Sequence, residues 1–161
     1  MAVNIIVEDG TGKTDATSYV SIAEFKTYWT QKGITHTEDD DTIAVWLNSA
    51  TQYADYLVRW GGDIYSYDQA LQIPRINWVD MSGRILEDVP TQVKNGVCEL
   101  AQLLQGDTIT NDQGIASESY GGISVTYKKN RDELTLNYPD AFMWFNKVTS
   151  INGSTLFGIP L

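Results

Sequence analysis

The sequence holds only one cysteine and one histidine among its 161 residues. The single cysteine, Cys98, excludes an internal disulfide framework and suits a reducing compartment. Together with the single histidine, His36, it falls short of the ligand set of a structural zinc site. We expect Cys98 to be a small core residue with a protonated thiol, and His36 to be a solvated loop residue.

Long apolar runs are also absent, since none approaches the roughly 18 residues that a membrane-spanning helix requires. The first residues lack the apolar segment of a secretory signal. We therefore expect a soluble protein, made in the cytoplasm, with no membrane partner. Its length fits one domain, and 42% apolar and 20% charged residues are ordinary for a globular protein.

Basic residues are scarce: 11 Lys and Arg stand against 21 Asp and Glu, which gives a net charge of −10. The one basic cluster, at residues 128–131, is followed at once by Asp132 and Glu133. A protein that grips nucleic acid without sequence preference needs Lys and Arg on its binding face to release counterions. The charge therefore argues against a nucleic-acid grip and favours a solvated acidic surface.

Apolar residues at helical spacing predict a mainly α-helical domain. Ser21 and Glu24 form a capping box at the start of a first helix, which ends near Gly33. A second helix is predicted from Thr37 to residue 60, with acidic residues at the positive end of its dipole. A weak alternation over residues 3–7 predicts a short strand before these helices.

Pro90 opens the predicted third helix. Gly96 inside it is unfavourable by about 1 kcal/mol relative to Ala, so we expect it to allow the close approach of another helix. The preceding residues, 63–87, have no sustained period and predict an ordered loop pinned by aromatic packing. A short fourth helix is predicted from Tyr138.

Residues 117–127 alternate on both sides of a Gly-Gly pair and predict a β-hairpin. A lone two-stranded hairpin is marginal in water, so it needs a helix, the N-terminal strand or a neighbouring subunit. We predict that it lies at a subunit interface or faces a channel. The residues assigned to this site are Tyr120, Gly121, Gly122, Ile123, Val125 and Tyr127.

The last ten residues, 152–161, are apolar but aperiodic. Such a segment either folds back on its own domain or docks on another chain. We predict that residues 1–151 form a single helical domain that includes the hairpin, and that residues 152–161 form a docking arm. The partner-binding residues assigned to this arm are Leu156, Phe157, Ile159, Pro160 and Leu161.

Two motifs suggest chemistry at first sight. Residues 10–14, GTGKT, resemble the end of a phosphate-binding loop, but Val7 stands where that loop needs a glycine and no helix follows directly. The contiguous carboxylates at residues 39–41 lack the glycine turn of a calcium loop, so helix capping is preferred. We predict a turn and a cap here, no catalytic residue, metal or cofactor, and hence no enzyme.

Several other motifs resemble a family of small tailed-phage proteins. They are VEDGTG at 7–12, SYVS at 18–21, Gln69-Ala-Leu, Pro74-Arg75, Pro90 with Val93, Glu99-Leu-Ala101, and SES with ISVTY at 117–127. These motifs look structural, not catalytic, and the resemblance covers residues 5–127. Ile73 departs from it, because an aromatic residue is expected before the Pro-Arg pair.

Members of this family are often labelled DnaT-like single-stranded-DNA-binding proteins, and they also resemble the head–tail connectors beneath the phage portal. The resemblance implies three to four bundled helices, a hairpin and an extended C-terminal arm. It implies a ring of twelve subunits in the virion neck, assembled in the host cytoplasm. Its partners would be the portal protein, a tail-side neck or tail-completion protein and other copies of itself. Genomic DNA would pass through the ring without specific binding.

The acidic charge favours the connector among the functions that the resemblance leaves open. The competing function is a DnaT-like single-stranded-DNA-binding replication protein, which would need a groove that is both aromatic and basic. A third is another neck, tail-completion or assembly protein.

Overall fold

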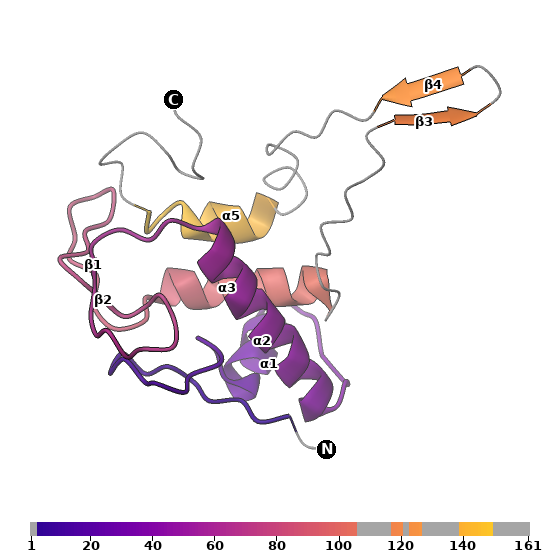
Figure 1. Ribbon diagram of the computed structural model, residues 1–161. Coiled ribbons are helices and arrows are strands. Elements are labelled where there is room, and N and C mark those ends of the chain that lie inside the picture. Colours follow the sequence, from indigo (N-terminus) through magenta and orange to yellow (C-terminus); the bar gives the residue numbers. More distant parts are fainter. Residues whose placement is uncertain (1–2, 106–116, 121–122, 127–138, 150–161) are drawn as a thin grey trace.

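The computed structural model describes residues 3–105, 117–120, 123–126 and 139–149, and these are mainly helical (Figure 1). The helices are α1 (Ile22–Gln31), α2 (Asp40–Leu57), α3 (Thr91–Leu104) and α5 (Pro139–Phe145). Among the described helices, none is long and apolar enough to cross a membrane. The predicted fold class, a helical bundle with a β-hairpin, is confirmed. The arm at residues 152–161 lies outside the described residues, so the domain division stays a prediction.

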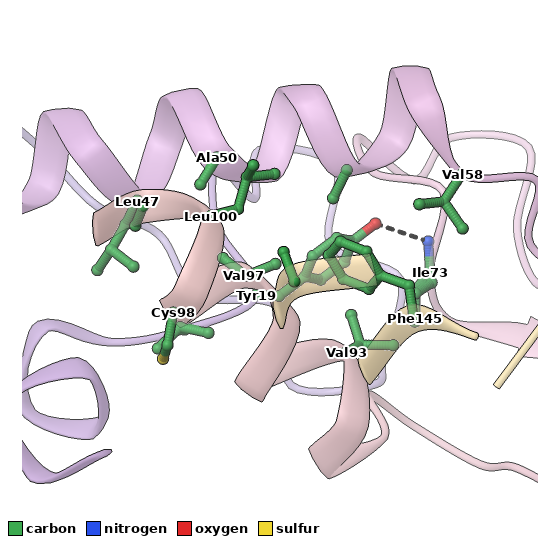
Figure 2. Packing of buried hydrophobic residues seen from close by; sticks show 14 of the residues in the cluster. Tyr19, Leu47, Ala50, Val58, Ile73, Val93, Val97, Cys98, Leu100 and Phe145 are labelled. Atoms are coloured by element: carbon green, nitrogen blue, oxygen red, sulfur yellow. Dashed lines mark hydrogen bonds between the residues drawn. The ribbon is translucent and has the colours of Figure 1, made fainter. Parts of the chain in front are cut away.

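Helix α3 is the centre of the bundle, because it contacts α1, α2 and α5. In Figure 1, α2 crosses α3 while α5 lies along it. In Figure 2 the side chains of Leu47 and Ala50 point from α2 toward α3. The buried face of α3 carries the apolar residues that its spacing predicts, namely Val93, Val97, Leu100, Ala101 and Leu104.

At Gly96, α5 packs tightly against α3. Three ring atoms of Phe145 lie within 2.8 Å of the point that a Cβ at this position would occupy. Phe145 itself is buried, and Figure 2 shows it below α2 and beside α3. The expectation that Gly96 allows close helix packing is therefore confirmed.

The first two helices begin at carboxylate and hydroxyl caps. The capping box of α1 is confirmed, with Ser21 Oγ accepting from the Glu24 amide at 3.2 Å. In α2 the predicted cap at Thr37 is wrong, because Asp39 accepts from the Thr42 amide at 2.8 Å and starts the helix later. This helix also ends at Leu57, before the predicted Gly-Gly stop, because the next residue adopts an extended conformation.

The strand predicted over residues 3–7 is not formed. Val7 makes only an isolated parallel bridge with Ser18. The ladder cannot extend, because the partner segment turns at once into the cap of α1 at Ser21. Two backbone bonds still fix this edge: Thr17 N donates to Ile6 O at 2.8 Å, and Glu8 N donates to Ser18 O at 2.9 Å.

The predicted hairpin is confirmed as β3 (Ser117–Tyr120) paired antiparallel with β4 (Ile123–Thr126). Tyr120 faces Ile123 in the register, and Val125 faces Glu118. Among the named elements, the two strands contact only each other, and Figure 1 draws them apart from the helices. Gly121, Gly122 and Tyr127 lie outside the described residues. The interface or channel role of the hairpin stays a prediction.

Residues 58–90 are an ordered connection that contains β1 (Asp63–Ile64) and β2 (Arg75–Ile76). Trp78 anchors it, since its ring is fully buried and its Nε1 donates to Val148 O at 2.8 Å. The prediction of an ordered loop pinned by aromatic packing is confirmed for this tryptophan. Tyr65 and Tyr67, in contrast, are exposed.

Gly96→Ala should destabilise the protein, although the same change in an open helix stabilises by about 1 kcal/mol. The added methyl group would overlap the Phe145 ring, and overpacking costs about 1–3 kcal/mol. Urea unfolding of this variant beside Asn95→Ala, which changes the neighbouring helical position, measures the effect. Equal or greater stability of Gly96→Ala would show that α5 does not pack against α3 in this way.

Candidate functional site

Four of the motifs that suggest the family resemblance, VEDGTG, SYVS, Gln69-Ala-Leu and Pro74-Arg75, come together at one place, which we call the motif junction. It comprises residues 8–13, Tyr19, Asp55 at the end of α2, and residues 69–75. These segments are far apart in the sequence, and they are joined by hydrogen bonds between buried or half-buried groups. The junction is therefore the first place to look for a functional site.

Residues 8–13 form a turn whose backbone amides surround a carboxylate from the same turn. Glu8 is 1% exposed. It accepts from the amides of Gly10 at 2.9 Å, Gly12 at 3.0 Å and Lys13 at 2.8 Å. A phosphate-binding loop aims such amides at its ligand. Here the chain's own carboxylate already occupies them, so the predicted turn is confirmed.

The Ala70 amide joins this turn to the connection that follows α2, and Gln69 orders that connection. The Ala70 amide donates to Lys13 O at 2.8 Å. The Gln69 side chain is buried, and its Nε2 donates to Leu71 O at 2.7 Å and Pro74 O at 3.1 Å. Its Oε1 accepts from the Ser66 amide at 2.8 Å. Every polar atom of this side chain therefore holds backbone in place.

Asp55 and Tyr19 form the buried centre of the junction. The Tyr19 hydroxyl donates to Asp55 Oδ1 at 2.7 Å and accepts from the Ile73 amide at 3.1 Å, the bond dashed in Figure 2. Asp55 also accepts from Trp60 Nε1 at 3.1 Å and from the Gln72 amide at 3.0 Å. Burial raises the pKa of Asp55, and burial beside this carboxylate raises the pKa of Tyr19 strongly.

Arg75 joins the backbone shortly after α2 to the backbone at residue 72. Its guanidinium donates to Gly61 O at 2.6 Å, Gly62 O at 2.9 Å and Gln72 O at 3.2 Å. Burial lowers its pKa, although arginine stays charged at any physiological pH. The side chain thus binds backbone carbonyls and is not free to hold a ligand. Ile73, the departure from the family pattern, is fully buried beside it.

The histidine lies elsewhere, and its predicted solvated position is wrong. The His36 side chain is 5% exposed. Its ring packs among Phe25, Trp29 and Trp46, with the Phe25 centroid at 4.9 Å. Nδ1 lies 3.0 Å from Glu38 Oε2. Because the aromatic rings of α1 and α2 surround it, the His36 ring is shielded from water, although the linker that carries it is polar and rich in Thr.

Cys98 is confirmed as a buried core residue, and burial raises its pKa. The acidic run at residues 39–41 divides among three partners, and the predicted capping role is confirmed for Asp39. Asp39 caps α2, Asp40 pairs with Lys26 at 2.7 Å, and Asp41 accepts from the Val3 amide at 3.0 Å. No group of three or more His, Cys, Asp or Glu within the described ranges could hold a metal ion. The predicted arm residues, 156–161, lie outside those ranges.

The described surface offers little free positive charge. Of its eight Lys and Arg residues, five form ion pairs with carboxylates: Lys13, Lys26, Lys32, Arg84 and Lys94. Lys147 lies over the Trp144 ring at 3.9 Å, and Arg75 binds carbonyls. Within the described part of the chain, Arg59 is the one that remains.

Glu8 and Tyr19 lie in two of the family motifs, but the sequence analysis assigned no role to either side chain and did not single out Asp55. Asp55 did carry a signal, since it is a carboxylate beside the apolar stripe of α2, between Ala54 and Leu57. Glu8 precedes a Gly-x-Gly turn, where a carboxylate can accept several amides. The partners of both residues come from distant segments, which no local pattern reveals.

A family model described as "Putative DnaT-like ssDNA binding protein" matches residues 3–157. No curated protein and no solved structure was found to match the chain. The family description names neither a head–tail connector nor a portal partner. It is nearer to the single-stranded-DNA-binding alternative than to the connector.

Asp55→Ala should destabilise the protein by about 2–5 kcal/mol, because it leaves the Tyr19, Trp60 and Gln72 donors without their acceptor. Asp55→Asn keeps one acceptor oxygen and should cost about 1–3 kcal/mol. Asp68→Ala, at an exposed position, is the control and should stay within about 0.5 kcal/mol. Urea unfolding measures all three, and an effect of Asp55→Ala as small as the control would exclude the junction as a stabilising network.

The raised pKa of Asp55 should make the stability of the protein depend on pH. The ordinary pKa of an aspartate is 3.8, so as the pH rises Asp55 loses its proton at a lower pH in the unfolded chain than in the folded protein. Over that window the folded state binds more protons than the unfolded state, and stability falls with rising pH. Wild type should therefore lose stability relative to Asp55→Asn from about pH 4 upward. A difference between the two that grows in favour of wild type would contradict this sign.

Proposed function

The chain belongs to the family of DnaT-like ssDNA-binding proteins, and we propose that it is a structural interaction protein, the head–tail connector of a tailed phage. It acts without catalysis, as a homo-oligomeric ring in the virion neck, assembled in the host cytoplasm. Its partners are the portal protein and a tail-side neck or tail-completion protein.

The proposal rests on the contacts of the Lys and Arg side chains in the described residues, almost all of which already have a partner. A protein that holds single-stranded DNA lines its groove with free Lys and Arg, because each phosphate contact releases counterions. In the described residues these side chains pair with carboxylates, bind backbone carbonyls or lie over an aromatic ring, with the exception of Arg59. An acidic ring of such subunits would repel the genome and let it slide through without specific binding.

The family description favours a second candidate function, the binding of single-stranded DNA. Exposed aromatic side chains give it some physical support, because bases stack on such rings. Tyr56 is 79% exposed three residues before Arg59, and Tyr67 is 98% exposed. One arginine is too little charge for a phosphate-tracking groove, so the connector remains our proposal.

The experiment pairs two binding measurements on the full chain. We expect it to bind purified portal rings and to leave a fluorescein-labelled single-stranded oligonucleotide unbound at physiological salt. A variant that ends at residue 151 should keep its fold and lose portal binding, because the apolar arm supplies the contact. Circular dichroism and thermal unfolding provide the folding control.

Micromolar oligonucleotide binding with a steep salt dependence, and no portal binding, would overturn the connector in favour of the replication protein. Binding to the tail-side neck protein alone would instead indicate a different neck or tail-completion protein. Unfolding of the shortened variant would place the arm in the domain's own core and leave the hairpin as the docking element.

A further inference from the structure

We propose that the exposed surface beside the motif junction docks a segment of a partner protein that carries Lys or Arg next to apolar side chains. We call it the tyrosine surface and define it by Asp63, Tyr65, Tyr67, Asp68 and Ile76. The inference rests on the proposed function, because it assigns the surface through which this chain would contact the portal or the tail-side protein.

The tyrosine surface combines apolar exposure with a defined position in the fold. Tyr65 is 53% exposed, Tyr67 is 98% exposed and Ile76 is 45% exposed. Ile76 is the register partner of Asp63, so the two side chains project from the same face of the two-stranded sheet. Tyrosines in such a setting supply large contact area with little entropy to lose, which is why they recur at the centres of protein interfaces.

The backbone beneath the surface is held rigidly, which distinguishes it from an ordinary exposed loop. Arg75 binds the carbonyls of Gly61 and Gly62 directly before β1. The turn that carries the tyrosines is closed by the buried Gln69, whose Oε1 accepts from Ser66 N at 2.8 Å. The Tyr65 ring lies against Gly12 of the N-terminal turn. A surface ordered before binding forfeits little entropy when a partner docks.

The charge of the surface selects the partner. Asp68 forms no ion pair among the described residues, and the Asp63 carboxylate accepts only the Asn77 amide, at 3.2 Å. The charge of Arg75 acts on Asp63, but its N–H groups donate to backbone carbonyls and leave the Asp63 oxygens open to a partner. Nucleic acid is repelled by these carboxylates, and within the described residues a second copy offers only Arg59 as a cation without a partner. A different protein with unpaired Lys or Arg complements the surface.

The test measures the affinity of the full chain for immobilised portal rings and for the tail-side neck protein. Tyr67→Ala should weaken binding to the partner that docks here by at least about tenfold, as the loss of an interface hot spot does. Asp68→Lys should weaken it as well and flatten its dependence on salt, because a charge pair becomes a repulsion. Both positions are exposed, so thermal unfolding should match that of wild type.

The controls are Val45→Ala on α2 and Asp140→Lys on α5, which change an exposed apolar residue and an exposed carboxylate elsewhere. Both should bind like wild type. If wild type binds a partner and the tyrosine-surface variants bind equally well, the surface is wrong and the connector function stands. If wild type binds neither protein, both proposals fall. A labelled oligonucleotide that binds wild type but not Tyr67→Ala would reassign the surface to base stacking.

Discussion

A buried carboxylate, Asp55, is the constraint on which the rest of the junction depends. It lies in the last turn of α2 and receives hydrogen bonds from the Tyr19 hydroxyl, the Trp60 indole and the Gln72 amide. Those donors come from the N-terminal segment and the connection after α2, so one residue of α2 joins the helix to two other parts of the chain. A buried ionisable group is costly unless its partners are complete, and here they are.

Helix existence and the apolar stripes could be predicted from the sequence, because a helix is a local structure with a period that sequence displays. Gly96 could be interpreted for the same reason. The predicted Thr37 cap was wrong because several adjacent residues could cap α2 and only geometry selects Asp39. His36 was misplaced because its aromatic neighbours come from both α1 and α2. The Asp55 network was missed, since its partners converge only in three dimensions.

The structure gives a physical explanation for the family motifs at the motif junction. The Glu8 turn, Gln69 and Arg75 each use polar side chains to hold backbone, and none presents a free group to a ligand. This use of polar groups builds a rigid frame that carries exposed tyrosines and carboxylates on its outer side. This frame and the engaged cations of the described surface are the physical basis of our proposal that the chain contacts other proteins.

The connection after α2 is a rigid part of the core rather than a loose loop. Native-state hydrogen exchange at the Ile73 and Gln72 amides tests it most directly, because these amides donate to Tyr19 and Asp55. We expect both to exchange only with an opening free energy close to that of global unfolding, together with the amides of α2. Exchange of Ile73 and Gln72 at the rate of an open loop, while α2 stays protected, would contradict the account.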